Sequence, residues 1–305
     1  MKISCSLLFF FGFGVWVTSF AQQDPQYTQY MYNMAQVNPA YAGTNERLSV
    51  TAMYRRQWSG FDNAPETLTL GIHSPISEKI GIGLSVIEDQ LGPVQETNAH
   101  VDFSYVINLG YDYNIAFGLK AGAAFHNVGL ADLETIDAND PFFSENIDNL
   151  YPRAGLGVYL YSDFYYLGLS VPNILSSVHL DENGIQYGSE TNHFFLMGGY
   201  VWDATQDWKI KPSFLVKSAF GAPLSFDLNV NTLYNEKFEL GVSYRLNDSF
   251  SGLVGFYVAP NVRIGYAYDH VISDLNGVSS SSHEIVLQFD LVRFKYRDLR
   301  RVRFF

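Results

Sequence analysis

Apolar and polar residues alternate one by one along much of this chain, most regularly in its last third. Between Ser225 and Asn231, Phe226, Leu228 and Val230 alternate with polar residues. A two-residue period is the pattern of a β-strand with one apolar face. The same alternation recurs in three further runs, at 238–245, 252–258 and 262–269. These runs follow one another after only a few turn residues, which predicts antiparallel hairpins.

The same pattern predicts fourteen strands in the whole chain. The other ten are expected at 47–58, 65–73, 79–88, 97–109, 112–124, 153–160, 163–170, 193–202, 207–217 and 283–291. A soluble sheet with one packed face would alternate in the same way, but its strands average about 5 to 6 residues, whereas barrel strands run to about 10. We therefore predict an all-β fold, an antiparallel transmembrane β-barrel of the outer membrane over residues 47–292.

The lengths of the connections support the barrel. Numbered along the chain, every second connection is short, and these are 74–77, 110–111, 161–162, 203–206, 234–235 and 259–260. The others include the long segments 125–152, 171–192 and 271–282. Outer-membrane barrels have short periplasmic turns and longer outer loops, whereas a β-sandwich gives no reason for such sorting.

Nearly all charged residues of the strands fall on one face. A charge facing lipid at mid-bilayer costs about 2 to 4 kcal/mol, so the charged face is predicted to line the lumen. The expected lumen charges are Arg55, Asp102, Lys120, Lys209, Lys211, Asp227, Glu239, Arg245, Arg263 and Asp269. Arg56 faces the other way, near a strand end beside Trp58, where the cost falls to about 0 to 1 kcal/mol.

The first residues predict export. Lys2 precedes an apolar run from Leu7 to Val17, and Ser19-Phe20-Ala21 provides small residues at the positions that signal peptidase recognises. We therefore expect residues 1–21 to be a cleaved signal peptide. The only cysteine, Cys5, lies in this segment. The mature chain is thus expected to contain no disulfide and no cysteine-based metal site.

Residues 22–46, which we call the strap, follow neither strand nor helix periodicity and are rich in Gln, Asn and Tyr. A disordered leader would have such polar content, but four tyrosines supply ring area that favours packing. We predict an ordered strap that folds into or against the mouth of the barrel. Pro39 and Gly43 then mark a turn into the first strand.

Composition agrees with a membrane barrel that carries no catalytic site. Aromatic residues make up 16% of the chain, with 21 Tyr and 24 Phe, and membrane interfaces recruit such residues. The formal charge of −12 argues against a nucleic-acid partner. Seven histidines are scattered, and no metalloprotease, serine-hydrolase, phosphate-loop or dinucleotide motif occurs. We expect no catalytic residue, metal or cofactor.

The last residues, 293–305, form a basic tail, with six of the 19 Lys and Arg in 13 positions. It is too charged to be a membrane strand and is expected to hang in the periplasm or to thread back into the lumen. Three hypotheses remain open for it: contact with anionic lipid headgroups, pairing with acidic lumen residues, or binding of a periplasmic protein. The candidate contact residues are Arg300, Arg301 and Arg303.

Two sequence segments resemble a known family. They are DPQYTQYMYNMAQVNPAYAG, residues 24–43, and YRRQWSGFDNAPETLTLGIHSPI, residues 54–76. They are similar to the opening of the PorP/SprF outer-membrane proteins of the Bacteroidetes. The residues that carry this resemblance most clearly are Asp24, Pro25, Gln26, Tyr27, Asn38, Pro39, Ala40, Tyr41, Gly43, Tyr54, Arg55, Arg56 and Trp58.

The resemblance implies a component of the type IX secretion system, or an accessory barrel for one cargo. It implies proximity to the PorK/PorN ring and to a periplasmic peptidoglycan-binding partner. It also implies a role in secretion or surface attachment of large adhesins that carry a type B C-terminal signal domain, the adhesins of gliding motility among them. The residues themselves leave two function classes open: a barrel that docks a secreted protein, and a channel for small molecules.

Overall fold

The structure, a computed structural model, describes residues 26–60, 63–110, 112–131, 145–175, 178–182, 185–189, 192–219, 222–273 and 281–292. The predicted signal peptide, Asp24, Pro25 and the basic tail lie outside these residues. Among the described residues, no helix has the length and apolar content to cross a membrane.

The described residues form a closed antiparallel barrel of fourteen strands. The strands are β1 (Arg47–Arg56), β2 (Glu66–Pro75), β3 (Ile80–Leu91), β4 (Val94–Asn108), β5 (Asn114–Val128), β6 (Ile147–Tyr161), β7 (Tyr165–Val171), β10 (His193–Tyr200), β12 (Trp208–Ala219), β13 (Ser225–Tyr234), β14 (Phe238–Arg245), β15 (Ser249–Ala259), β16 (Val262–Val271) and β17 (Ser281–Val292). All fourteen predicted strands are confirmed.

Each strand pairs with its neighbours in sequence, and one further contact closes the barrel. This contact joins β1 to β17, from Arg47 opposite Val292 to Arg56 opposite His283. Among the neighbour pairings, β10 pairs with β12 from His193 opposite Ala219 to Gly199 opposite Ser213. The pairing on that side is interrupted at Pro212, after which the two-residue strand β11 (Trp202–Asp203) pairs with β12. Proline has no N–H to donate to a neighbouring strand, which explains the break.

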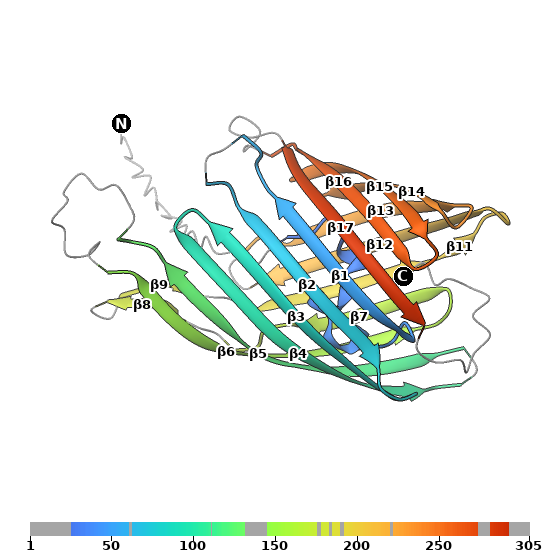
Figure 1. Cartoon of the computed structure of the whole chain (residues 1–305), viewed down its shortest axis with the longest axis horizontal. Coiled ribbons are helices and arrows are strands. Elements are labelled where there is room, and N and C mark those ends of the chain that lie inside the picture. Colours follow the sequence, from blue (N-terminus) through green and yellow to red (C-terminus); the bar gives the residue numbers. More distant parts are fainter. Residues whose placement is uncertain are drawn as a thin grey trace, which may run out of the picture.

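The structure differs from the sequence prediction in the long connections. Strands β5 and β6 run to Val128 and from Ile147, so they take up much of the connection expected at 125–152. The connection expected at 171–192 contains a separate hairpin of β8 (Val178–Glu182) and β9 (Ile185–Ser189), which lies beyond one end of the barrel (Figure 1). Its alternation was too short to be recognised in the sequence.

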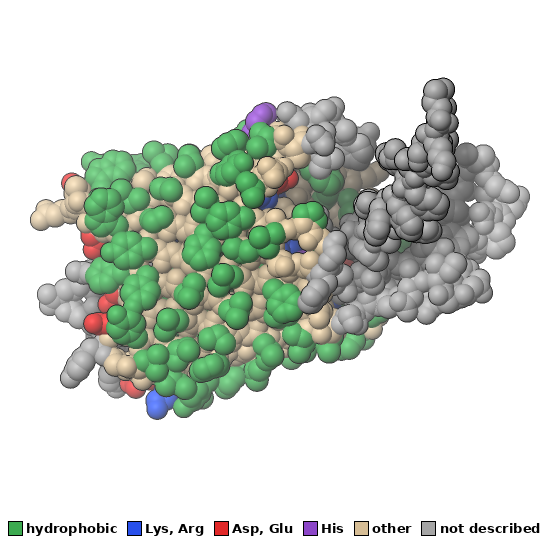
Figure 2. Space-filling view, turned by 180° about the vertical axis from the view of Figure 1, so that it is seen from behind, with side chains coloured by type: hydrophobic (Ala, Val, Ile, Leu, Met, Phe, Trp, Pro, Cys, Tyr) green, Lys and Arg blue, Asp and Glu red, His purple; other side chains and the backbone are tan. Residues whose placement is uncertain are grey.

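The connections at one end of the barrel, which we call the turn end, are all short (Figure 1). The long ones lie at the other end, the loop end, together with short ones such as 92–93 and 246–248. Hydrophobic side chains cover the outer wall, and charged ones appear mainly near its ends (Figure 2). Exposed outer residues include Val101, Phe103, Leu119 and Leu240. The alternation therefore places apolar side chains outside, as a lipid-facing wall requires.

The described part of the strap, residues 26–46, lies inside the barrel (Figure 1). It forms three short helical segments: η1 (Tyr30–Tyr32), α1 (Met34–Val37) and η2 (Pro39–Tyr41). Tyr30, Met31 and Met34 are each 1% exposed. Burial of such side chains stabilises a structure by about 1.5 to 3 kcal/mol each. Among the described residues, the strap therefore supplies half of the main hydrophobic cluster, and the inward faces of the strands supply the other half.

Candidate functional site

The strap and the lumen wall around it form the candidate site. A cluster of charged wall residues binds the strap near the beginning of its described part, at Thr28 and Gln29. The carboxylate of Glu284 accepts hydrogen bonds from the backbone N–H groups of Thr28, at 2.9 Å, and Gln29, at 2.8 Å. The Thr28 hydroxyl donates to Asp269 at 2.7 Å. Arg55 lies between the two carboxylates, with Nη1 2.8 Å from Asp269 and 3.1 Å from Glu284. We call these contacts the strap latch.

The strap latch joins the two sequence segments that carry the family resemblance. Thr28 belongs to the first segment and Arg55 to the second, and the Arg55 guanidinium donates to the Thr28 hydroxyl at 3.0 Å. Asp269 and Glu284 stand near the loop ends of β16 and β17. The strap is therefore fixed by β1, β16 and β17 in the loop half of the lumen.

The second half of the strap packs against the wall through the sequence Asn38-Pro39-Ala40-Tyr41. The Asn38 side chain accepts from the Ala40 N–H at 3.0 Å, which caps η2, and donates to the carbonyl of Val158 at 3.0 Å. An added Cβ at Gly118 would overlap the backbone of Ala40. Glycine on β5 thus permits the close approach of the strap.

The strap ends at a turn that also requires glycine. Gly43 has a φ of +74°, in the left-handed region, and a Cβ there would lie 2.8 Å from the Cα of Gly81. The Gly43 N–H donates to His73 at 3.2 Å, and Tyr41 meets the His73 and Tyr159 rings edge-on. Because Gly81 is the second residue of β3, close to the turn end, the strap runs through the lumen from the loop half to the turn end.

Further charges line the wall in pairs of opposite sign. Arg245 binds the Asp227 carboxylate through Nε at 2.8 Å and Nη2 at 2.9 Å, and the Lys120 ammonium lies 3.1 Å from Asp102. Such buried pairs are costly to break, because the remaining charge would have no partner. Lys209 differs, since it lies at the turn end and binds the exposed Glu236 at 3.1 Å.

An aromatic ring of the strap takes part in one of these pairs. Arg263 binds Glu239, with Nη2 2.6 Å from the carboxylate, and its guanidinium lies 3.3 Å from the centre of the Tyr32 ring. The Lys211 ammonium lies 4.9 Å from the same ring. Cations over an aromatic face are attracted by the ring's quadrupole. Tyr32 thus joins the strap to β12 and β16.

Two tyrosines of the strap, Tyr30 and Tyr32, stay uncharged. Burial raises the pKa of the Tyr30 hydroxyl and of the Tyr32 hydroxyl well above the usual value. The neutral Tyr30 hydroxyl accepts a hydrogen bond from the Asn229 amide at 3.1 Å. Tyr30 therefore adds a hydrogen bond to the lumen without adding a charge at neutral pH.

Most of the site residues predicted from the sequence lie together in the lumen. Nine of the ten expected lumen charges are buried, Lys209 being the partly buried one at the turn end. Arg56 faces outward, with its Nε 3.5 Å from Glu66. Tyr54 donates to the same Glu66 at 2.9 Å, and Trp58 lies in the following connection. The contact candidates Arg300, Arg301 and Arg303 lie outside the described residues.

Several residues of this site were not predicted from the sequence, namely Thr28, Gln29, Gln36, Glu96, Arg153, Lys217 and Glu284. Glu284 and Lys217 have the inward parity of their strands, so the alternation alone could have identified them. The strap residues have no such signal, because their positions depend on the surrounding wall. Among the described residues, no group of three His, Cys, Asp or Glu could hold a metal ion.

A second feature lies at the turn end, where a cavity of about 570 Å³ opens beside the last strap residues. It is lined by Thr44, Glu46, Glu78, Lys79 and Asn108, among others. The strap therefore leaves room for solvent at the turn end of the lumen.

A closed barrel with an apolar outer wall, a charged lumen and connections sorted by length is an outer-membrane β-barrel protein. The family model for the type IX secretion system membrane protein PorP/SprF matches residues 19–289, nearly the whole chain. The chain belongs to that family. The resemblance recognised in the two N-terminal segments is thereby confirmed. A search of curated proteins finds no match.

Solved structures with a similar fold include three outer-membrane proteins. The CymD monoaromatic hydrocarbon channel has a TM-score of 0.52 at 12% identity, covering 87% of this chain and 94% of that one. A Pseudomonas aeruginosa FadL homologue has a TM-score of 0.49 at 12% identity, covering 84% and 93%. Acinetobacter baumannii Omp33 has a TM-score of 0.47 at 11% identity, covering 81% and 98%. At such identity, the likeness to CymD shows the fold alone.

Proposed function

We propose that this protein is a non-enzymatic barrel of the type IX secretion system that docks a large secreted protein and supports its secretion or surface attachment. The cargo would be an adhesin-like protein with a type B C-terminal signal domain. The observation that carries the proposal is the strap, whose buried side chains and latch contacts occupy the lumen. A barrel filled in this way is better suited to holding a partner than to conducting solutes.

The two ends of the barrel suit different partners. The loop end carries the long connections and the β8–β9 hairpin, and it faces the cell exterior in barrels of this kind. We assign cargo docking to this end. At the turn end, we propose contacts with the PorK/PorN ring and with a periplasmic peptidoglycan-binding partner. The basic tail follows β17 at that end and is the candidate for these contacts.

The test is to purify the tagged protein from native outer membranes and to identify by mass spectrometry what remains bound after detergent washing. We expect a large secreted adhesin, together with components of the secretion system. An unrelated barrel with the same tag, purified in parallel, is the control. If the protein is recovered without a partner that is absent from the control, the docking proposal is wrong.

The second candidate function is a channel for diffusion or uptake of small molecules. The turn-end cavity favours it, because about 570 Å³ of space leads into the lumen from that side. CymD, whose fold is similar, is named as a channel for monoaromatic hydrocarbons. Measurable conductance of the intact protein in a planar bilayer would support the channel over docking.

A further inference from the structure

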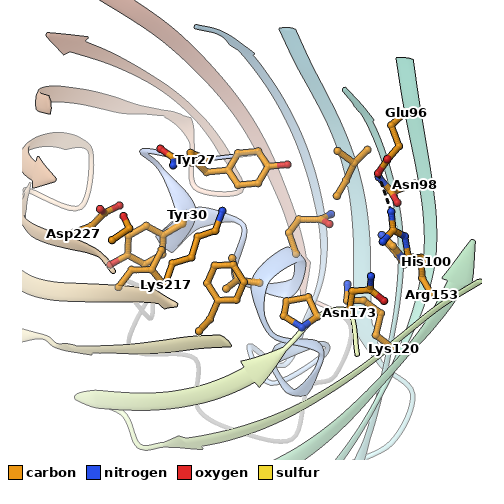
Figure 3. A pocket seen from close by; sticks show the side chains of 18 of the residues that line it. Tyr27, Tyr30, Glu96, Asn98, His100, Lys120, Arg153, Asn173, Lys217 and Asp227 are labelled. Atoms are coloured by element: carbon orange, nitrogen blue, oxygen red, sulfur yellow. Dashed lines mark hydrogen bonds and ion pairs between the residues drawn. The ribbon is translucent and has the colours of Figure 1, made fainter. Parts of the chain in front are cut away.

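A second cavity, of about 120 Å³, lies between the strap and the wall in the loop half of the lumen. The strap contributes Gln26, Tyr27, Tyr30, Gln36 and Val37 to its lining. Figure 3 shows wall residues on both sides of the strap. Lys217 and Asp227 lie on one side, and Glu96, Asn98, His100, Lys120 and Arg153 lie on the other.

The lining presents more cations than carboxylates. Four cations line the cavity, Lys120, Arg153, Lys217 and Arg245, against two carboxylates, Glu96 and Asp227. Arg153 reaches Glu96 at 3.0 Å, and Arg245 binds Asp227. Two carboxylates that do not line the cavity also form ion pairs with lining cations, Asp102 with Lys120 and Asp248 with Arg245. A guanidinium offers five N–H donors and an ammonium three, so the surface that a ligand would meet is rich in donors.

The cavity also contains a buried amide without a partner. Gln36 on α1 is 7% exposed, and neither its Nε2 nor its Oε1 has a hydrogen-bond partner among the described residues. Buried polar groups in native proteins are nearly always paired, and exceptions call for an explanation such as an absent ligand. An amide side chain offers one kind of donor and one acceptor, which a peptide group can match simultaneously.

We propose that this cavity binds the carboxylate of an acidic peptide segment that enters from the loop end. The carboxylate would accept hydrogen bonds from the lysine and arginine donors, and the adjoining peptide group would pair with Gln36. Phe195, Leu215 and Val37 provide apolar surface for the rest of the segment. The inference rests on the proposed docking function for the source of the peptide, because the same chemistry would also bind a free organic acid.

The test uses the full-length protein in detergent micelles and isothermal titration calorimetry with three probes. The first is acetyl-Gly-Glu-Gly-amide, the second is acetyl-Gly-Gln-Gly-amide, and the third is glutarate, a free dicarboxylate. We expect the Glu peptide to bind at least tenfold more tightly than the Gln peptide. We also expect this preference to shrink severalfold at high salt, since it depends on charge.

Two variants of one strand provide a matched comparison. Lys217→Gln removes a lining cation near the loop end of β12, whereas Lys209→Gln removes a cation of the same strand at the turn end, beyond the cavity. The preference for the Glu peptide should be lost in Lys217→Gln and retained in Lys209→Gln. Gln36→Leu should weaken both peptides equally, because it removes the amide and not the charge.

Three outcomes would overturn the proposal. Equal binding of the two peptides, or no binding of any probe, would show that the cavity does not select a carboxylate. If glutarate binds and the Glu peptide does not, the ligand is a free organic acid and not a peptide segment. Each is independent of cargo recovery from native membranes. Recovery of cargo without peptide binding would leave the docking function intact and remove only this inference.

Discussion

At the scale of single residues, the lumen is organised by charges whose partners lie far apart in the sequence. Arg55 in β1 meets Asp269 in β16 and Glu284 in β17, and all three are almost fully buried. Opposite charges in a buried site stabilise only when their hydrogen bonds are completed. The backbone of Thr28 and Gln29 completes those of Glu284. The strap thus contributes hydrogen bonds to the same charge network that holds it in place.

Arg55→Gln is expected to destabilise the barrel by about 3 to 5 kcal/mol, because it leaves two buried carboxylates without their cation. The measurement is the free energy of unfolding in urea, followed by the change in electrophoretic mobility of the folded barrel. Arg56→Gln is the matched control. Its side chain is half exposed and its pair with Glu66 is at the surface, so the loss should be about 0 to 1 kcal/mol. Equal losses for the two variants would contradict the role of the strap latch.

At the scale of elements, the strap has no regular pattern of its own and takes its shape from the wall. Its longest helix, α1, has only four residues. Isolated helices of that length are unstable in water, so tertiary contacts must hold it. Gly118 on β5 admits the backbone of Ala40, and Asn38 binds the carbonyl of Val158 on β6. The strands therefore act as the template on which the strap folds.

Deletion of residues 24–42 is expected to raise single-channel conductance in planar bilayers, because it removes the part of the chain that fills the lumen. The control is deletion of residues 293–305, which leaves the strap and the fourteen strands in place. Its conductance should remain low. If removal of the strap also leaves conductance low, the strap does not plug the barrel.

At the scale of the whole molecule, the barrel has two unlike ends. The connections at the turn end are short, and those at the loop end include 129–146, 172–192 and 272–280. Both the strap and β17 reach the turn end, where Val292 lies opposite Arg47, and the basic tail follows Val292 in the sequence. One end is thus suited to periplasmic contacts and the other to contacts outside the cell.

Reversal of Arg300, Arg301 and Arg303 to Glu is expected to weaken co-purification with the secretion ring several-fold, because the contact is proposed to depend on positive charge. Heat-modifiable mobility should remain normal, since the tail follows the last strand. The matching Lys variant keeps the charge and should co-purify as the natural chain does. Undiminished recovery of the ring with the Glu variant would contradict this contact.

The sequence determined the strands, their inward and outward faces, and the even strand number. A barrel strand has a two-residue period, and lipid excludes charge from one face. The sequence of each strand therefore indicates by itself which face meets the lipid and which faces the lumen. Lys120 and Asp227 could be placed in the lumen for this reason. Their pairing with Asp102 and Arg245 also follows from the hairpin register, because consecutive strands are neighbours.

Only the tertiary structure decided where the strap lies and what holds it. Thr28 and Glu284 meet because the barrel closes between β1 and β17, a contact between the two ends of the chain. The conformation of residues 26–46 and the two cavities beside them depend on many strands at once. Local alternation reports which face a residue takes, but closure of the barrel decides which residues share its interior.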